Sequence, residues 1–461
     1  MQFSLAEILK ITQAQILSGE GSPNLTSLST DSRTVQKGDY FLCLVGEKFN
    51  AHDYMEEVAG KGAAALILEK KYFKPAQHQN LPLLLIGVED TLKALGDLAQ
   101  AWRARFSIPV LGIGGSNGKT TTKDMCAAIL SEYYSTLATE GNLNNLIGVP
   151  KMIAKLDARH QAAIFELGMN DFGELARLTE IAQPTLGLLT NIGFEHLEKL
   201  KSLEGVAQAE AELFETLPSG SLALVNEDDP YISKMKTKAY RLTFGLENPA
   251  DIFCSAWEME AQKIIFEVCY LGKKYSFYCE ALGEANLRNA LAAVAVGFAL
   301  ALPYEAIKRG LQKFKARAMR MELISLGKKT LLNDCYNANP SSMEVALQSL
   351  AGLKKGKKAL AILGEMRELG HFAAEGHRRV GKIVVKNQID YLVSIGPYAQ
   401  EMLQAAVASG LEASHALAAS NLEEAEQKIK EWAQEASFII VKGSRGAKME
   451  RVTELLKKSP L

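Results

Sequence analysis

The most informative segment of the chain reads Gly112-Ile113-Gly114-Gly115-Ser116-Asn117-Gly118-Lys119-Thr120-Thr121-Thr122. It follows the apolar run 108–111 and leads into a helix-like run at 119–133. A strand, a glycine-rich loop, Lys-Thr and a helix together predict a phosphate-binding loop, because glycines let backbone N–H groups approach an anion and the helix N-terminus adds partial positive charge. Lys119 is expected to reach the terminal phosphates, and the Thr120 hydroxyl to ligate Mg²⁺.

The loop departs from the strict phosphate-loop pattern at one position. The pattern places glycine five residues before Gly118, where Ile113 stands, and glycines flank that position. A glycine-rich turn that merely caps a buried strand is the alternative, and Lys-Thr at the start of the helix disfavours it. The residues expected around the phosphates are therefore Gly115, Ser116, Asn117, Gly118, Lys119, Thr120 and Thr121.

Length and composition narrow the class of protein. A chain of 461 residues suggests about three domains, which we predict at 1–85, 86–315 and 316–461. Lys and Arg (52) nearly balance Asp and Glu (53), so the charge predicts no nucleic-acid and no membrane partner. The six cysteines lack metal-ligand spacing and indicate reduced thiols of a cytoplasmic protein. The sequence shows neither a signal peptide nor an apolar run of transmembrane length.

Strand-like and helix-like runs alternate along most of the chain. In the central part, apolar strands separated by helices indicate a parallel sheet, and these strands lie at 162–167, 185–190 and 221–225. Residues 252–280 read as short alternating strands and predict an antiparallel edge. A third α/β unit begins near 316, with strands expected at 330–334, 359–363, 391–395 and 438–441. No G-x-G-x-x-G fingerprint is present, so a dinucleotide role has no support.

Two polar residues follow the expected central strands. Glu166 closes one strand, and His196 follows the next. Ligands of open α/β sheets bind outside the carboxyl ends of the strands, so Glu166 beside the phosphate loop is suited to hold Mg²⁺ directly or through water. A glutamate that caps the next loop is the alternative for Glu166, and an ordinary surface residue is the alternative for His196.

Glu210 lies where a buried stripe is expected. Residues 202–217 place apolar side chains on one helical face, and these are Leu203, Val206, Ala207, Leu213, Phe214 and Leu217. Glu210 falls on the same face. A buried carboxylate is costly unless a cation or hydrogen bonds compensate it, and a metal shared with His196 would do so. The alternative is the edge of the stripe, where Glu210 would reach water.

Two asparagine-rich segments offer further ligand contacts. Residues 141–150 contain Asn142, Asn144 and Asn145, whose amides suit neutral polar ligands and phosphate oxygens; an ordinary loop is the alternative. Residues 333–340 follow the first strand of the third unit, where Asp334 is suited to ribose hydroxyls and nearby Arg320 to phosphate. A helix N-cap region is the alternative for this second segment. If both contacts hold, the third domain closes over a nucleotide bound by the second.

Together these residues resemble the Mur ligase family, which builds the peptide of bacterial cell-wall precursors. The resemblance spans nearly the whole chain and rests on residues 31–33, 112–122, 141–150, 166–168, 196–198, 286–290, 334–340 and 442–446. The Tyr-Asn-Ala-Asn-Pro string, the double-asparagine loop and the closing Lys-Gly-Ser-Arg-Gly are typical of the branch that adds D-alanyl-D-alanine.

The resemblance implies a small N-terminal α/β substrate domain, a central P-loop ATPase-like parallel sheet with an antiparallel edge, and a C-terminal Rossmann-like α/β domain. It implies a peptidoglycan-precursor ligase that uses ATP and Mg²⁺ to add D-alanyl-D-alanine to a UDP-N-acetylmuramoyl tripeptide through an acyl phosphate. Such an enzyme is expected in the bacterial cytoplasm. No surface feature of the sequence points to an oligomer, so a monomer is expected.

By the same resemblance, Lys119 neutralises the transferred phosphate, Thr120 and Glu166 bind one Mg²⁺, and His196 binds a second. Asn286 and Asn289 would face the adenine, Arg320 the phosphates and Asp334 the ribose, with Asn339 also at the nucleotide. The substrate contacts are expected from residues 46–52 and from Ser32, Arg33, Asn142, Asn144, Asn145, Tyr336, Asn337, Lys442 and Arg445.

Two positions depart from the family pattern. Gly114 stands where the family usually has threonine, and Glu210 where it usually has a lysine that CO₂ carbamylates to serve the second metal. We hypothesise that the Glu210 carboxylate replaces the carbamate, which makes Glu210 a candidate catalytic residue beside Lys119, Glu166 and His196. The rival functions are a sibling ligase that adds a single amino acid, a folylpolyglutamate synthase, and a nucleotide-binding regulator without catalysis.

Overall fold

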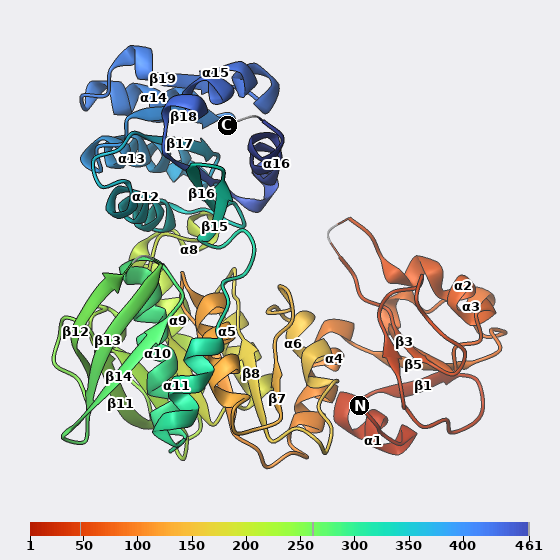
Figure 1. Cartoon of the computed structure of the whole chain (residues 1–461). Coiled ribbons are helices and arrows are strands. Elements are labelled where there is room, and N and C mark those ends of the chain that lie inside the picture. The colour runs from red at the N-terminus through yellow and green to blue at the C-terminus, as the bar shows by residue number, and fades with distance from the viewer. Residues whose placement is uncertain (47, 261, 460–461) are drawn as a thin grey trace.

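The computed structural model describes residues 1–46, 48–260 and 262–459. These residues form three sheets, and Figure 1 shows each sheet at the centre of a separate lobe with helices against it. This confirms the predicted α/β architecture with three domains. No helix in the described ranges is long and apolar enough to cross a membrane.

The N-terminal lobe contains a five-stranded sheet with the order β1-β5-β4-β3-β2. Strands β2 to β5 are parallel, and β1 pairs antiparallel with β5. Every residue of β4 and β5 is buried, as expected for parallel strands covered on both faces. The bounds are β1 Gln15–Ser18, β2 Leu28–Ser29, β3 Tyr40–Leu42, β4 Ala65–Glu69, β5 Leu84–Val88, α1 Leu5–Thr12, α2 Met55–Gly60 and α3 Pro75–His78.

Helix α4 (Thr91–Arg103) connects this lobe to the central one. Asp90 caps it by accepting the Lys93 N–H at 2.9 Å. Leu95 and Leu98 pack into the N-terminal core, whereas Ala99 packs into the central core. Strand β5 runs across the predicted boundary between residues 85 and 86, and the domain limits remain a prediction.

The central sheet has nine strands in the order β14-β13-β12-β11-β10-β9-β6-β8-β7. The strands from β7 to β12 along this order are parallel, and β12, β13 and β14 form the predicted antiparallel edge. The bounds are β6 Val110–Gly114, β7 Thr136–Ala138, β8 Ala162–Glu166, β9 Leu186–Leu189, β10 Leu222–Asn226, β11 Tyr240–Gly245, β12 Ile252–Glu260, β13 Lys263–Tyr270 and β14 Lys273–Cys279.

Helices cover both faces of the parallel centre of this sheet, where every residue of β6, β8 and β9 is buried, whereas much of the antiparallel edge is exposed. One layer includes α5 (Lys119–Leu130), α10 (Gly283–Ala299) and α11 (Tyr304–Lys313). The other includes α6 (Gly148–Ile153), α7 (Glu174–Ala182), α8 (Leu197–Leu200) and α9 (Leu203–Thr216). Ile113 of β6 lies opposite both Glu166 of β8 and Leu188 of β9, so the loops after these strands meet at one edge.

The C-terminal lobe contains a six-stranded sheet with the order β15-β16-β20-β17-β18-β19, in which only β15 is antiparallel among the described strands. The four strands predicted here are β16, β17, β18 and β20. The bounds are β15 Glu322–Leu326, β16 Lys329–Asp334, β17 Ala359–Gly364, β18 Tyr391–Ile395, β19 Ala416–Ala419, β20 Phe438–Lys442, α12 Pro340–Lys354, α13 Ala373–Lys386, α14 Ala399–Ala408, α15 Leu422–Glu435 and α16 Glu450–Lys458.

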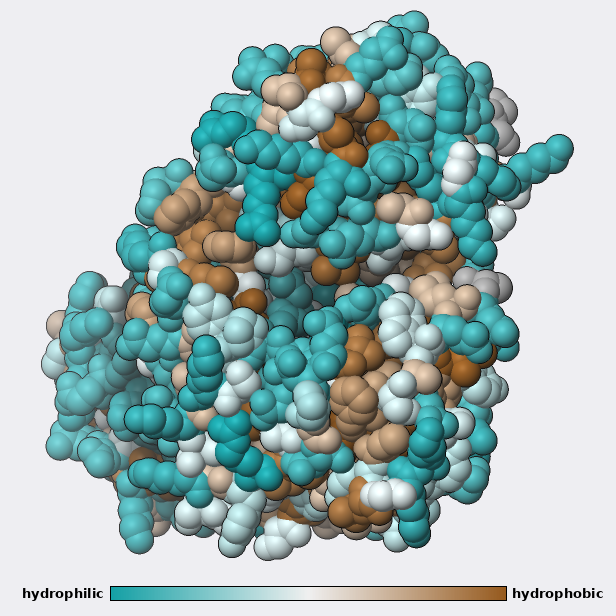
Figure 2. Space-filling view, turned by 90° about the vertical axis from the view of Figure 1, so that its left-hand side faces the viewer, coloured by the Kyte–Doolittle hydropathy of each residue, from teal (hydrophilic) through white to brown (hydrophobic). Residues whose placement is uncertain are grey.

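The C-terminal lobe rests on the central lobe, with α8 and the start of α12 between them (Figure 1). One continuous cluster of buried apolar side chains includes residues of both lobes. Figure 2 shows groups of hydrophobic residues on both sides of the view at mid-height, with a recessed hydrophilic area between them. The carboxyl ends of the parallel strands of both sheets face this boundary, which is where sheets of this kind bind ligands.

Candidate active site

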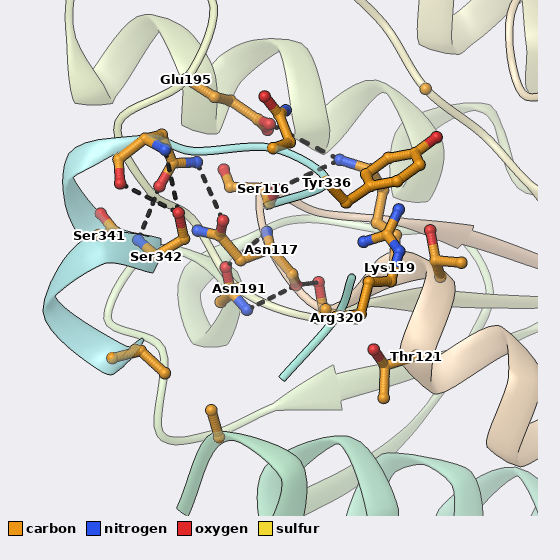
Figure 3. Close-up of a pocket in the computed structure, with 18 of the residues that line it drawn as sticks. Ser116, Asn117, Lys119, Thr121, Asn191, Glu195, Arg320, Tyr336, Ser341 and Ser342 are labelled. Atoms are coloured by element: carbon orange, nitrogen blue, oxygen red, sulfur yellow. Dashed lines mark hydrogen bonds and ion pairs between the residues drawn. The ribbon is translucent and has the colours of Figure 1, made fainter. Parts of the chain in front are cut away.

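A cavity of about 780 Å³ lies between the central and C-terminal lobes, at the loops that follow β6, β8, β9, β16, β17 and β20. It brings together most of the predicted site residues, which are Ser116, Asn117, Gly118, Lys119, Thr120, Thr121, Asn142, Asn144, Asn145, Glu166, His196, Asn286, Asn289, Arg320, Asp334, Tyr336, Asn337, Asn339, Lys442 and Arg445. Four predicted residues do not line it: Gly115, Glu210, Ser32 and Arg33. Figure 3 shows Lys119, Thr121, Arg320 and Tyr336 around the same space.

The phosphate loop is shaped by two glycines in the left-handed region. Gly115 has φ 109° and Gly118 has φ 82°. A Cβ at Gly115 would collide with Thr190, and one at Gly118 would collide with the Asn289 side chain. Only glycine satisfies both the backbone angle and the close approach at these positions.

The backbone N–H groups at the start of the loop are bonded inside the protein. Gly115 N–H donates to Glu210 Oε2 at 2.7 Å, Ser116 N–H to Asn191 O at 2.8 Å, and Asn117 N–H to Asn191 Oδ1 at 3.0 Å. Helix α5 begins at Lys119, so the amides of its first turn have no acceptor within the helix. The donors available to an anion are therefore those from Gly118 onward.

Lys119 lies against the loop with its amino group buried among carboxylates. Its Nζ donates to Gly115 O and lies 3.7 Å from Glu195 Oε2. Burial opposes the charged form, but the negative charges of Glu195, Glu210 and Glu166 outweigh burial and raise the pKa of Lys119. Lys119 is therefore positively charged beside the glycine-rich loop, and its contact with a phosphate remains a prediction.

Glu166 has the geometry expected of a magnesium ligand. Its Oε1 accepts the Thr120 hydroxyl at 3.2 Å and the Asn144 amide at 3.0 Å. Its Oε2 is buried without a hydrogen-bond partner in the described structure. A buried oxygen of this kind calls for a cation or water. Mg²⁺ typically takes one or two protein oxygens and completes its shell with water and phosphate, so Glu166 and Thr120 fit this ion.

His196 is oriented by the C-terminal lobe. Its Nδ1 pairs with Glu368 Oε2 at 2.8 Å, and its Nε2 lies 3.8 Å from Glu195 Oε2. Burial disfavours the charged ring, but Glu368 and Glu195 outweigh burial and raise the pKa of His196. Among the described residues no three His, Cys, Asp or Glu side chains form a ready metal cluster. A second metal at His196 thus remains a prediction.

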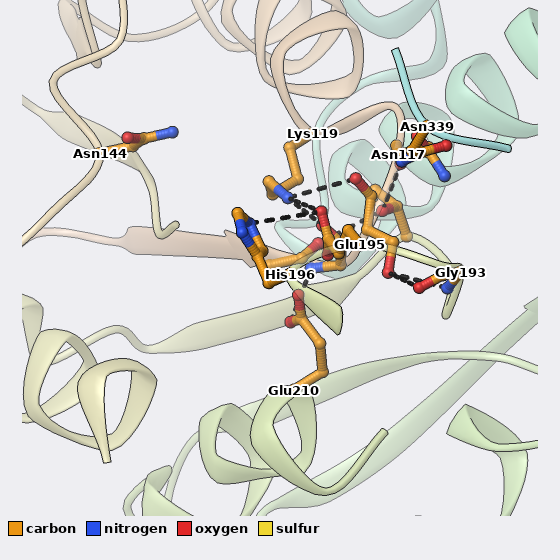
Figure 4. Close-up of polar contacts among 12 residues, drawn as sticks. Asn117, Lys119, Asn144, Gly193, Glu195, His196, Glu210 and Asn339 are labelled. Carbon is orange, nitrogen blue, oxygen red and sulfur yellow. Dashed lines mark hydrogen bonds and ion pairs between the residues drawn. The ribbon is translucent and has the colours of Figure 1, made fainter. Parts of the chain in front are cut away.

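Glu210 is buried beneath the phosphate loop, and only 1% of the residue is exposed. The alternative in which Glu210 reaches water is therefore wrong, because α9 packs its face fully into the core. Burial raises the pKa of Glu210 to about 7, and the charge of Lys119 acts against this rise. Figure 4 shows the Glu210 side chain extending from its helix toward the group that contains Lys119, Glu195 and His196. Its predicted role at a metal remains untested by the geometry.

The C-terminal side of the cavity holds one stacked cation and one buried ion pair. The Arg320 guanidinium lies 3.9 Å from the centre of the Tyr336 ring. Lys442 Nζ lies 2.5 Å from Asp334 Oδ2 and 3.0 Å from Asn337 O. Asp334 Oδ1 accepts the Met321 N–H at 3.0 Å, so both oxygens proposed for ribose already have partners within the protein.

Amide side chains link the central and C-terminal lobes and bond within the 141–150 segment. Asn339 caps α12 through Ser342 N–H at 2.7 Å, as the alternative interpretation held, and its Nδ2 also donates to Asn117 Oδ1 at 2.9 Å. Asn145 Oδ1 accepts the Ile147 N–H at 3.2 Å and the Gly148 N–H at 2.9 Å, which holds the turn that leads into α6.

Arg33 and Ser32 lie in the N-terminal lobe, outside the cavity. Arg33 is exposed and pairs with Asp31 at 2.7 Å, and the Ser32 carbonyl accepts Lys61 Nζ at 2.7 Å. Residue 47, within the predicted substrate segment 46–52, lies outside the described residues. The predicted contacts of this lobe with the substrate remain predictions.

The structure adds three side chains that the sequence interpretation left unassigned: Glu195, Asn191 and Glu368. Glu195 lies between Lys119 and His196, its side chain is 11% exposed, and its Oε1 is buried without a hydrogen-bond partner in the described structure. Each of the three follows a parallel strand, so the strand-end rule applied to every polar residue there would have found them.

The fold and the cavity define a P-loop α/β protein whose anion site lies between two domains. Residues 113–297 match the family model of the Mur ligase middle domain, and residues 319–445 match that of the Mur ligase, glutamate ligase domain. The chain belongs to the Mur ligase family, which confirms the resemblance seen in the sequence.

Full-length relatives narrow the comparison. The chain is 32% identical to the UDP-N-acetylmuramoyl-tripeptide–D-alanyl-D-alanine ligase of Bacillus subtilis (strain 168), over 94% of this chain and 93% of the relative. Crystal structure I of MurF from Acinetobacter baumannii superposes with a TM-score of 0.90 at 30% identity, covering 99% of both chains. The MurF ligase of Thermotoga maritima in complex with ADP superposes with a TM-score of 0.83 at 25% identity, covering 94% of this chain and 97% of that one.

Proposed function

We propose that this chain is the ATP-dependent ligase that joins D-alanyl-D-alanine to a UDP-N-acetylmuramoyl tripeptide. The observation that carries the proposal is the meeting of Lys119 and the open amides of α5 with Arg320 and Tyr336 of the C-terminal lobe, in one cavity. Relatives named for this reaction match along the whole chain, and one was solved with ADP. We further propose that the enzyme acts as a monomer in the bacterial cytoplasm, in line with its six free cysteines.

The proposed reaction has two chemical steps. A carboxylate oxygen of the tripeptide attacks the γ-phosphorus of ATP, ADP leaves, and an acyl phosphate forms. The amine of D-alanyl-D-alanine then attacks the acyl carbon, and the tetrahedral intermediate collapses with loss of phosphate and a proton. Lys119 and the amides from Gly118 onward stabilise the charge on the transferred phosphoryl group. Thr120 and Glu166 would hold Mg²⁺, which neutralises phosphate charge when bound.

The remaining contacts divide between the lobes. Asn286 and Asn289 lie along α10 beside the loop and are proposed to face the adenine. Ser32 and Arg33 are proposed to hold the UDP end of the acceptor. Asn142 and Asn144 line the cavity on the side of Glu166, where the reacting carboxylate would enter.

The test is phosphate release from ATP with each substrate omitted in turn. Release that requires both the UDP-tripeptide and D-alanyl-D-alanine is expected, and Lys119→Ala should abolish it. Turnover with a single amino acid in place of the dipeptide would indicate a sibling ligase. ATP binding without turnover under any combination would indicate a nucleotide-binding regulator and refute the proposal.

A further inference from the structure

Gly114 and Glu210, the two positions that depart from the family pattern, lie beside each other in the structure. Glu210 Oε2 accepts the Gly115 N–H at 2.7 Å, which joins α9 to the phosphate loop across 95 positions of sequence. A Cβ on Gly114 would lie 2.8 Å from this same oxygen and 2.8 Å from Leu189 Cδ2. The carboxylate therefore occupies space that exists because residue 114 has no side chain.

We propose that Glu210 is a positioning residue that anchors the phosphate loop through Gly115, and that Gly114 is the glycine this anchor requires. The inference rests on the proposed nucleotide site, and it assigns Glu210 a role that needs no metal. By this inference the glycine at position 114 provides the space that the glutamate at position 210 occupies.

The hydrogen bond from Glu210 restrains Gly115, whose carbonyl group is also bonded within the protein. The Gly115 carbonyl accepts Lys119 Nζ, while its N–H donates to Glu210. Asn191 holds the next two amides of the loop. With these three amides satisfied internally, the loop has one arrangement, and the amides from Gly118 onward remain directed to an anion. Loss of the Glu210 acceptor leaves a buried N–H without a partner and frees the start of the loop.

The chemistry of this anchor separates it from metal ligation. A hydrogen bond to Gly115 N–H needs an oxygen acceptor, which glutamine supplies as well as glutamate. A cation needs the negative charge, which glutamine lacks. Leucine is similar in size to glutamate and glutamine but supplies neither an oxygen acceptor nor a negative charge. Glutamine and leucine at position 210 therefore both remove the charge, and only leucine also removes the acceptor.

The test measures ADP binding by calorimetry in EDTA, where no divalent ion takes part. Glu210→Leu should weaken ADP binding about tenfold, whereas Glu210→Gln should stay within about twofold of the unchanged chain. Gly114→Ala should weaken binding as Glu210→Leu does, because its methyl group displaces the carboxylate. Glu215→Leu makes the same change on the exposed face of α9 and should have no effect. Thermal melting checks that each variant is folded.

Coupling between the two positions gives a second measurement. Gly114→Ala should cost less than about twofold when added to Glu210→Ala, because no carboxylate remains to displace and the other close atom, Leu189 Cδ2, ends a side chain that can shift into the vacated space. The proposal is overturned if Glu210→Leu binds ADP normally in EDTA, if glutamine and leucine at 210 weaken binding equally, or if the two changes multiply. The result does not depend on ligase turnover, so a chain that binds ADP but forms no amide would refute the proposed function alone. An unchanged chain that fails to bind ADP would overturn both.

Discussion

Replacing Lys442 by methionine tests whether this lysine holds the C-terminal side of the cavity together or contacts substrate. Its amino group lies 2.5 Å from Asp334 Oδ2, and the two side chains are 3% and 13% exposed. Methionine keeps the length of the side chain but leaves the Asp334 carboxylate in the protein with only the Met321 N–H beside it. Breaking a buried pair in this way costs roughly 3–5 kcal/mol of stability. Because Asp334 keeps one hydrogen bond, we expect the C-terminal lobe to lose about 3 kcal/mol.

Hydrogen exchange of the β20 and β16 amides, followed by mass spectrometry, measures this loss within the C-terminal lobe. A local readout is needed because a chain of three domains does not unfold in one step. Lys457→Met removes an exposed pair with Glu454 on α16 and should change the same amides by less than about 0.5 kcal/mol.

The reasoning fails if Lys442→Met changes the opening free energy of β20 by less than about 1 kcal/mol, or no more than Lys457→Met does. A substrate-binding lysine would instead leave exchange unchanged and raise the KM for the acceptor. Asp334→Asn combined with Lys442→Met should restore part of the loss, because no unpaired charge then remains.

Acid should destabilise the N-terminal lobe, because His52 Nε2 accepts the Glu69 N–H at 3.0 Å and burial lowers the pKa of His52 from 6.5 to about 4. The neutral His52 ring contributes at most about 3 kcal/mol to the stability of the lobe; this contribution is present above pH 6.5 and is lost as the pH falls toward 4. His52→Asn should therefore reduce the fall in melting temperature between pH 7 and pH 5. His415→Asn is the control and should leave that fall unchanged. Glu368→Gln should lower the pKa of His196, because it removes a negative charge that pairs with the ring. An NMR titration that follows the chemical shifts of the ring's carbon-bound protons measures this pKa, and an unchanged value would contradict the pairing. Because residue 210 is glutamate rather than lysine, bicarbonate should not stimulate turnover at mildly acidic pH; marked stimulation would contradict this expectation.

The central sheet and its loops could be predicted because their signals are local. Apolar runs of strand length identify β6, β8 and β9, and parallel strands bring their carboxyl ends to one edge. The strand-end rule predicts the place of Glu166, whereas the glycine-rich loop with Lys-Thr at the start of a helix predicts that of Lys119. Short strands at the sheet edges, such as β7 and β19, escaped because a run of three or four residues with mixed burial has no clear period.

The partners of the site residues could not be predicted, because they come from distant segments. Nothing near His196 in the sequence indicates that Glu368 of the other lobe would pair with its ring at 2.8 Å. The sequence predicts Asp334 as a ribose ligand, but it does not show that Lys442 of β20 pairs with the same carboxylate. The type of a residue indicates which ligands its side chain can bind. Whether that side chain is free to bind them depends on the neighbours with which the fold pairs it.

The same limit explains why Gly114 and Glu210 looked like unrelated departures. The sequence showed Gly114 only as a departure from the usual threonine, and it showed Glu210 as a buried carboxylate in place of the usual lysine. The structure joins them through one oxygen atom, which bonds to Gly115 and fills the space beside Gly114. A glutamate here without the glycine would meet the Cβ of residue 114, and the glycine without the glutamate would leave the Gly115 N–H without this acceptor. Either change alone is unfavourable, so the pair is intelligible as an alternative way of building the loop rather than as decay of the site. Lys119 still faces Glu195 and Glu166, so the charge balance at the phosphate position does not depend on Glu210 alone.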